Sequence, residues 1–262
     1  MSTVAIKTPS SESDQLNELR DQIVACQKLK VTALDDAFLL KFLRSRKGHV
    51  ERTHELLVEY FNLRRSRPDV FKSASNVMDS FDREPLFDIL PKRNVTGETI
   101  VVLRPGRWDV EQYSLEFAFT SCVPFFEHAC LDEDTQRNGF IEIIDVRGLS
   151  WRHLARMHVS EIKFASDLTE RALPTKFKRI HVVFSSRLVS VMYNVIRPFL
   201  SQQLRNVIVF HTGDDLSELH KEVPKSVLPV ELGGAYKLPE HSDEKIMAID
   251  NQLEALWSRY KP

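Results

Sequence analysis

The chain has 262 residues, of which 42% are hydrophobic and 28% charged, and its formal net charge is −1. These values are typical of a globular protein with one large domain, or with one domain and a smaller attachment. A net charge near zero excludes a general electrostatic attraction to nucleic acid, so any binding to an anionic surface must come from a local basic patch.

Residues 1–13 are polar, and no run approaches about 18 apolar residues, so we expect neither a secretory signal nor a membrane span. Cys26, Cys122 and Cys130 are too few and too far apart for a disulfide framework or a zinc site. We therefore expect a cytoplasmic monomer without a nucleic-acid partner, whose contact with membranes is peripheral and reversible.

Three helical patterns in the first 70 residues predict a small helical bundle. The first pattern places Leu16 and Leu19 on one face, the second follows Asp35, and the third stops before Pro68. An acidic residue suits the start of a helix, and a proline cannot continue one. We assign a helical N-terminal subdomain to residues 12–75.

Beyond residue 95, predicted strands alternate with predicted helices, which favours an α/β fold with a mostly parallel sheet. We assign this domain to residues 85–245 and a separate C-terminal helix to residues 246–262. The strands are expected at residues 99–103, 140–146, 180–184 and 207–211, and the helices at residues 115–131, 161–173 and 187–197.

The predicted helix at residues 187–197 is unusually apolar for a surface helix. It follows a short buried strand, with Ser185 and Ser186 expected at its N-cap, and Pro198 ends it. Its only polar residues are Arg187, Ser190, Asn194 and Arg197. Such a helix is either enclosed in a core or covers an apolar molecule that is not protein.

Motifs of common enzyme classes are absent from the sequence. It has no GxGxxG after a strand, no P-loop, no GxSxG and no HExxH, so we expect no catalytic residues, no cofactor and no metal. His153, His158 and Glu161 have a loose metal-like spacing, for which a solvated helix start is the simpler interpretation.

Two carboxylates lie in or at the end of the strand at residues 140–146. Asp145 precedes a turn, where we expect it to accept backbone N–H groups, whereas Glu142 shares a face with Phe140 and Ile144. An interior carboxylate needs a partner or a raised pKa. Glu142 therefore either binds the polar group of a ligand or forms a structural hydrogen bond or ion pair. An enzyme that acts on a lipid through Glu142 or Asp145 is a further hypothesis.

Five segments together resemble the signatures of CRAL-TRIO lipid-binding proteins, in the same order and spacing over residues 12–245. The resemblance is strongest to the branch that contains alpha-tocopherol transfer protein and cellular retinaldehyde-binding protein. The segments are residues 36–46, 135–140, 145–148, 196–200 and 228–234.

This resemblance implies a sheet that floors an apolar cavity, with residues 187–197 as a mobile gate that opens at membranes. It also implies a non-enzymatic protein that binds and transfers a hydrophobic small molecule, such as a tocopherol, a retinoid or a carotenoid. The alternative is a phospholipid or phosphoinositide exchanger, or a signalling module that presents a lipid.

Position by position, the resemblance implies a cavity lining, to which we add Glu142 and Ile180 from the strands. The lining comprises Phe119, Cys122, Val123, Phe126, Phe140, Ile144, Ala165, Leu168 and Leu173 from the body and Val189, Met192, Tyr193, Val195, Ile196 and Phe199 from the gate. The branch has small hydroxyl residues where this chain has Cys122 and Phe126, so Phe126 is expected to shorten the cavity.

The same branch binds phosphoinositide head groups in a basic cleft. Arg46, Lys176 and Lys178 retain that cleft, and Arg205 lies nearby, whereas Gln203 and Val207 stand where the branch has basic residues. Recognition of phosphoinositides and a simple solvated basic surface remain the two alternatives.

Overall fold

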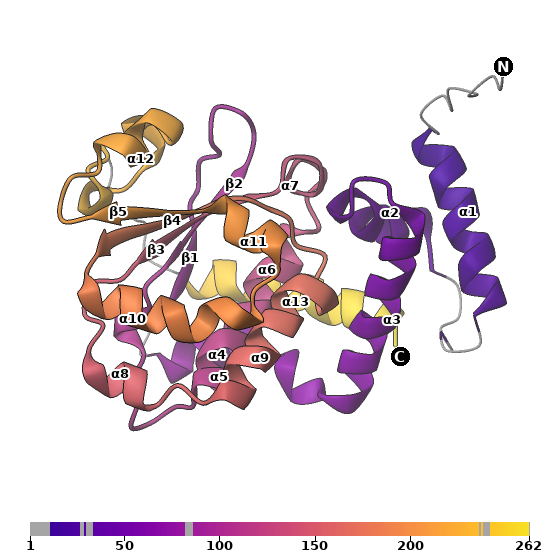
Figure 1. The fold of residues 1–262 in the computed structure, drawn as a ribbon. Coiled ribbons are helices and arrows are strands. Elements are labelled where there is room, and N and C mark those ends of the chain that lie inside the picture. Colours follow the sequence, from indigo (N-terminus) through magenta and orange to yellow (C-terminus); the bar gives the residue numbers. More distant parts are fainter. Residues whose placement is uncertain are drawn as a thin grey trace, which may run out of the picture.

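A computed structural model describes residues 11–26, 29, 34–81, 86–235, 237 and 242–261 of the chain. It consists of a central sheet with helices on both faces and a group of helices at one end (Figure 1).

The sheet has five strands in the order β1-β2-β3-β4-β5. Only β1 is antiparallel to its neighbour, so the predicted α/β fold with a mostly parallel sheet is confirmed. The strands are β1 (Phe87–Ile89), β2 (Thr99–Leu103), β3 (Phe140–Asp145), β4 (Phe177–Ser185) and β5 (Ile208–Thr212).

The two faces of the sheet are buried by different elements. On one face Ile100, Ile143 and Val183 pack with Leu219 of α12 (Ser217–Glu222). The opposite face, which carries Phe140, is covered in part by four helices, of which α10 is visible in front of the sheet in Figure 1. These helices are α5 (Leu115–Thr120), α6 (Val123–Ala129), α9 (Val159–Asp167) and α10 (Arg187–Ile196).

The single long helix predicted at residues 115–131 is wrong, because the structure has two helices there, α5 and α6. The Ser121 hydroxyl donates to the Ala118 carbonyl, the Cys122 thiol donates to the Phe119 carbonyl, and Pro124 lies in the first turn of α6. Side-chain bonds to the backbone compete with the helix ladder, and proline has no N–H to contribute to it. The helix is therefore interrupted at Ser121–Cys122.

The end of β4 departs from regular geometry just before α10. The register shifts between Val182 and Ser185, and Phe184 has a φ of +59°, which is uncommon for a non-glycine residue. Ser186 is the N-cap of α10 as predicted, but its side chain makes no capping hydrogen bond. After α10, a 3₁₀ turn spans Arg197–Phe199.

The helical end of the molecule is built from α1 (Glu12–Ala25), α2 (Asp36–Ser45) and α3 (Val50–Ser66). The last helix, α13 (Asp243–Arg259), runs back to it. The Tyr260 hydroxyl donates to Asp35 at 2.6 Å, and Arg64 donates to the Trp257 carbonyl at 2.9 Å. The C-terminus therefore lies beside α3 in Figure 1.

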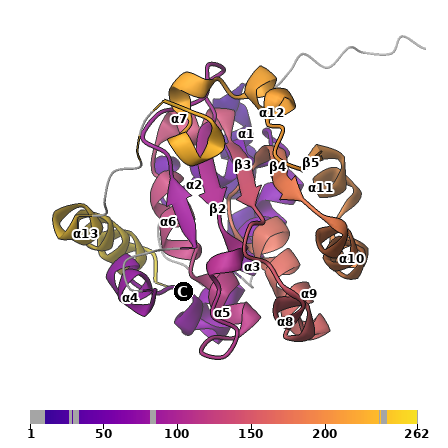
Figure 2. The same cartoon turned by 90° about the vertical axis from the view of Figure 1, so that its left-hand side faces the viewer.

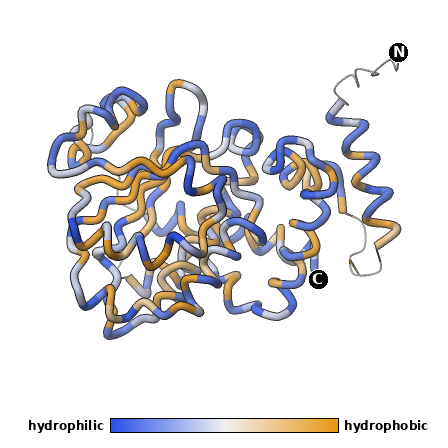
Figure 3. The backbone as a smooth tube through the Cα atoms, viewed as in Figure 1, coloured by the Kyte–Doolittle hydropathy of each residue, from blue (hydrophilic) through white to orange (hydrophobic). Residues whose placement is uncertain are grey.

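Several short helices had no clear sequence pattern. In the view of Figure 2, α4 lies with α13 to the left of the sheet, and α11 lies with α10 to its right. Figure 3 shows hydrophobic residues concentrated along the strands, while hydrophobic and hydrophilic residues alternate along the outer helices. The short helices are α4 (Ala74–Ser80), α7 (Glu133–Asn138), α8 (Trp151–Ala155) and α11 (Gln202–Val207), and a π-helical turn spans Leu168–Ala172.

Candidate functional site

Helix α10 presents one face to the body of the protein. Val189 and Met192 are buried, whereas Arg187, Ser190 and Asn194 are exposed. The few polar residues of this segment thus form its outer stripe, as expected for an amphipathic helix that lies on an apolar layer.

The two ends of α10 are held differently. Near its N-terminal end, Val189 packs against Val146 and Val182. Beyond its C-terminal end, the Ser166 hydroxyl donates to the Phe199 carbonyl at 2.6 Å. The segment is therefore packed against the sheet at one end and hydrogen bonded to the end of α9 at the other.

Most of the predicted cavity residues lie in three apolar clusters, of which the first and third include residues of the sheet. Ala165, Ile180 and Met192 are also buried, although they belong to none of these clusters. The first cluster contains Phe119, Cys122, Phe126, Phe140, Val195, Ile196 and Phe199, the second Val123, Leu168 and Leu173, and the third Ile144 and Val189.

Tyr193 lies away from these clusters. Its ring packs edge-on against Phe210 of β5, with the ring centroids 4.9 Å apart. Both rings line a surface hollow of about 400 Å³ beside the start of α10, together with Ser186 and Ser190.

Several apolar side chains between the sheet and α10 keep accessible surface. Phe140 is fully buried, whereas Phe119, Val195, Ile196 and Phe199 pack against the same cluster and keep accessible surface. A close-packed interior leaves almost no surface to a water-sized probe. We refer to the half-buried side chains Phe119, Cys122, Glu142, Ile144, Val195, Ile196 and Phe199 as the open layer.

Glu142 is the charged member of the open layer. In the part of the chain that the structure describes, no side chain or backbone group makes a hydrogen bond or an ion pair with it. Burial raises the pKa of Glu142 to about 7. Burial, and then the charge of Glu142, also raise the pKa of the Cys122 thiol, which places the two side chains near each other. Within the described residues, Glu142 therefore does not form the structural hydrogen bond or ion pair that the sequence left open.

The other polar candidates have structural roles. Asp145 accepts the backbone N–H of Arg147 at 3.1 Å and also pairs with its guanidinium group, so the predicted turn role is confirmed. His153 hydrogen bonds to Ser150, and Glu161 accepts the backbone N–H of Glu116. Within the described ranges, no group of three His, Cys, Asp or Glu side chains is arranged to hold a metal ion.

Phe126 lies at the centre of a group of aromatic rings. Its ring centroid is 4.7 Å from that of Phe87, 5.2 Å from that of Phe140 and 5.8 Å from that of Phe177. These rings pack together near the start of β3 and β4, and the shortening of a cavity by Phe126 stays a prediction.

The predicted basic residues lie around the start of β4. Arg46 donates to the carbonyl groups of Glu170 at 2.8 Å and Thr175 at 3.3 Å. Lys176 donates to the carbonyl of Arg137 at 2.6 Å. Burial lowers the pKa of Arg46 to about 10.

The charges of this group act on one another. Burial, followed by the charges of Lys178 and Lys47, lowers the pKa of Lys176 to about 8. Arg52 has the same effect on Arg46. Sequence reasoning missed Lys47 and Arg52, although Lys47 directly follows Arg46. We define Arg46, Lys47, Arg52, Lys176 and Lys178 as the basic cluster.

Arg205 adjoins the basic cluster through a chain of contacts. It bonds to the Ser201 carbonyl at 3.4 Å, the Ser201 N–H donates to the Glu170 carboxylate at 3.0 Å, and the Glu170 carbonyl accepts from Arg46. Gln203, on the same short helix, is exposed.

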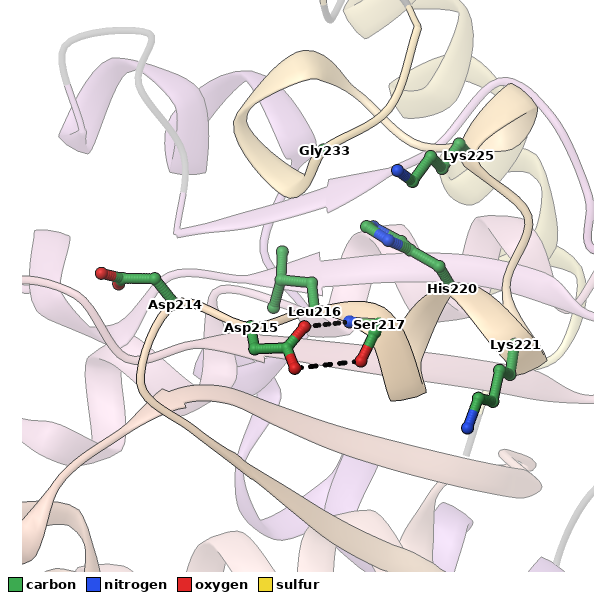
Figure 4. A pocket seen from close by; sticks show the side chains of 8 residues that line it. All are labelled: Asp214, Asp215, Leu216, Ser217, His220, Lys221, Lys225 and Gly233. Atoms are coloured by element: carbon green, nitrogen blue, oxygen red, sulfur yellow. Dashed lines mark hydrogen bonds between the residues drawn. The ribbon is translucent and has the colours of Figure 1, made fainter.

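A second surface hollow, of about 480 Å³, lies at α12 on the opposite face of the sheet. Figure 4 shows its polar lining, in which the Asp215 carboxylate accepts the Ser217 N–H at 2.9 Å and the Ser217 hydroxyl at 3.1 Å. His220, Lys221 and Lys225 complete the rim. None of the predicted ligand-binding residues lines this hollow.

Residues 84–234 match the CRAL/TRIO domain. The chain belongs to the CRAL-TRIO lipid-binding family. The resemblance found in the sequence segments is therefore confirmed. The chain is 32% identical over 217 residues to alpha-tocopherol transfer protein-like of Homo sapiens, which covers 82% of this chain and 63% of that protein.

Clavesin-2 of Rattus norvegicus is 31% identical over 232 residues, covering 87% of this chain and 70% of that protein. The chain thus spans about two thirds of the length of these relatives. The crystal structure of Sfh5 shares the fold, with a TM-score of 0.59 and 14% identity over 96% of this chain and 99% of that one. Within the described residues, every helix is too short or too polar to cross a bilayer.

Proposed function

We propose that this protein binds a hydrophobic small molecule in the open layer and carries it between membranes without changing it chemically. The observation that supports this proposal is the accessible surface that Phe119, Val195, Ile196 and Phe199 keep between the sheet and the helices. Side chains in this arrangement would gain contacts if an apolar molecule lay between them. Tocopherols, retinoids and carotenoids are the candidate ligands.

The energetics of such a carrier require no external energy source. Burying a lipid chain is worth about 0.8 kcal/mol per CH₂, so exposing a long chain to water costs on the order of 10 kcal/mol. An apolar layer in the protein returns most of that free energy. Exchange between protein and bilayer is then close to neutral, and only the barrier to crossing water remains.

Helix α10 acts as the gate that removes this barrier. If α10 swings outward, it exposes the apolar face that carries Val189 and Met192, which is unfavourable in water and favourable against lipid. Opening is therefore coupled to contact with a bilayer. The protein associates with membranes reversibly during transfer.

Co-expression with candidate lipids tests ligand binding directly. Native mass spectrometry should find the intact protein with one tocopherol, retinoid or carotenoid, and solvent extraction should recover that molecule unchanged. A chain that loads none of them, under conditions in which a related carrier does, would contradict the proposal.

The gate is tested by Val195→Asp, which places a charge in the open layer. We expect faster loss of the bound lipid in vesicle-free buffer. Asn194→Asp is the matched control, because it adds the same charge on the exposed face of the same helix. If both variants retain the bound lipid equally well, α10 is not the gate.

The basic cluster provides the site for anionic head groups, including phosphoinositides. Each Lys or Arg near an anionic leaflet contributes about 1 kcal/mol, so the five residues allow salt-sensitive docking. Lys176→Ala with Lys178→Ala should weaken binding to vesicles that contain phosphatidylinositol 4,5-bisphosphate while leaving lipid loading intact.

The control is Lys221→Ala with Lys225→Ala, which removes the same charge at α12 on the other face of the sheet. If both pairs weaken vesicle binding equally, the basic cluster has no specific role. Suppose that the protein transfers labelled phosphatidylinositol between vesicles and loads no tocopherol, retinoid or carotenoid. This result would support the alternative function, a phospholipid or phosphoinositide exchanger.

A further inference from the structure

Glu142 lies where a bound molecule can reach it. It is in the central strand β3, paired in register with Val101 of β2 and Ile180 of β4. Since residues alternate between faces, its side chain shares the face of Phe140 and Ile144. Phe140 packs in the same cluster as Val195 and Ile196. The accessible surface that Glu142 keeps is therefore directed into the open layer.

The surroundings of Glu142 leave its carboxyl group without a hydrogen-bond donor. Phe140, Ile144 and Ile180 are apolar, and the thiol of Cys122 already donates to the Phe119 carbonyl at 2.7 Å. Across residues 11–26, 29, 34–81, 86–235, 237 and 242–261, no group hydrogen bonds to Glu142. Burial raises the pKa of this carboxyl group, so its charged form is disfavoured where it lies. A ligand that supplies a hydrogen-bond donor would stabilise it.

The chemistry of a carboxyl group restricts which head group fits. A phosphate or carboxylate would face a like charge, and no cationic side chain contributes to the pKa of Glu142. An ammonium group has three donors, and the apolar neighbours would leave two of them unpaired. A hydroxyl group donates once to a carboxylate and can accept from the protonated acid, so it is satisfied in either state of Glu142.

We propose that Glu142 is a specificity-determining residue that selects an apolar ligand with a single hydroxyl group, an alcohol or a phenol, over ethers, acids and phospholipids. This inference rests on the proposed carrier function. It identifies the hydroxyl as the group that lies against β3, with the apolar part of the ligand along Phe119, Val195, Ile196 and Phe199.

The test compares matched probes that differ only in the head group. Retinol is paired with retinyl methyl ether, α-tocopherol with its methyl ether, and octadecanol with both octadecyl methyl ether and stearic acid. Retention is measured at pH 8 by competition and native mass spectrometry, for the wild type, Glu142→Leu and Glu142→Gln. Circular dichroism confirms that each variant is folded.

For at least one pair, we expect the wild type to retain the alcohol or phenol at least tenfold more strongly than the ether. Of octadecanol, its methyl ether and stearic acid, stearic acid should be retained most weakly. Glu142→Leu should retain the ether as well as the alcohol. Glu142→Gln, which can still accept a hydrogen bond, should keep part of the preference.

The two proposals fail in different ways. A wild type that retains alcohols and ethers equally, or an unchanged preference in folded Glu142→Leu, overturns the role of Glu142 and leaves the carrier intact. A wild type that retains none of the probes overturns the carrier function, and the inference about Glu142 falls with it.

Discussion

Two of the apolar regions of the protein differ in how accessible their side chains are. In the helical end, Leu19, Phe42, Leu57 and Phe61 are fully buried, and the rings of Phe42 and Tyr60 are 5.0 Å apart. In the open layer, apolar side chains keep accessible surface although they lie between a sheet and helices. The first interior stabilises the fold, and the second is the one in which we propose that a ligand binds.

The polar groups of the two regions differ in the same way. At the helical end, the buried Glu127 accepts from the Tyr60 hydroxyl at 2.9 Å and lies 3.6 Å from the Lys41 ammonium. Glu142 has no such partner in the described structure. Among the described residues, Glu127 thus has a hydrogen bond and an ion pair within the protein, although its second oxygen and the Lys41 ammonium make no hydrogen bond, whereas Glu142 has neither kind of contact.

The largest contrast should come from removing one aromatic ring in each region. Phe42→Ala should lower the free energy of unfolding by about 3–5 kcal/mol, because the ring is fully buried. Phe199→Ala, in the open layer, should cost at most about half of that, since its ring is already partly accessible. Urea denaturation measures both, and equal losses would remove the distinction between the two interiors.

Glu142 gives the second contrast, in the pH dependence of stability. Its pKa rises from an ordinary 4.5 to about 7 in the folded protein, so the folded state binds the proton more tightly than the unfolded state. The contribution of Glu142 to stability is therefore greatest below about pH 4.5 and is lost as the pH rises to 7, by up to about 3 kcal/mol. Glu142→Gln should be more stable than the wild type by this amount at pH 8 and equally stable near pH 4. A constant difference between the two proteins would show that Glu142 is not desolvated.

The buried network at the helical end should give a smaller loss. Tyr60→Phe removes a hydrogen bond to a charged group and should cost about 2 kcal/mol. The matched control is Tyr113→Phe, whose hydroxyl donates to the Ser80 carbonyl at 2.7 Å and is only partly buried. That change should cost about 1 kcal/mol or less. Chemical denaturation should rank the two variants in this order, and the reverse order would argue against the network.

The smallest effect concerns the basic cluster. Lys176 has a pKa of about 8, so it loses its charge as the pH rises from 7 to 9. Binding to anionic vesicles should weaken by about fivefold over this range, the equivalent of about 1 kcal/mol for one charge. Lys176→Arg keeps its charge and should show a flatter profile. Identical profiles in vesicle sedimentation would place Lys176 outside the contact.

Much of the fold was predictable because burial imposes a simple period on the sequence. The strand at residues 99–103 and the start of the helix after Asp35 agree with the structure at those positions. The break at Ser121–Cys122 was missed, because it depends on side-chain bonds to the backbone rather than on hydrophobic spacing. The edge strand β1 has only three residues, too few for a clear pattern.

The candidate site was predictable to a similar extent. Alternation alone placed Glu142 on the face of Phe140 and Ile144, and the family resemblance supplied the apolar residues. The absence of a partner for Glu142 depends on every neighbouring element and could not be predicted from spacing. Tyr193 illustrates the opposite case, since its contact with Phe210 depends on how β5 lies beside α10.

The return of α13 to the helical end has a consequence for how the molecule unfolds. Tyr260 is buried with Phe38 and Phe42, and its hydroxyl holds Asp35, whose carboxylate also caps α2. One hydrogen bond thus joins Asp35 and Tyr260, which are 225 positions apart in the chain. Although its apolar residues form several clusters, the chain should melt in a single cooperative transition. A protease that trims the last few residues should loosen the beginning of the chain as well.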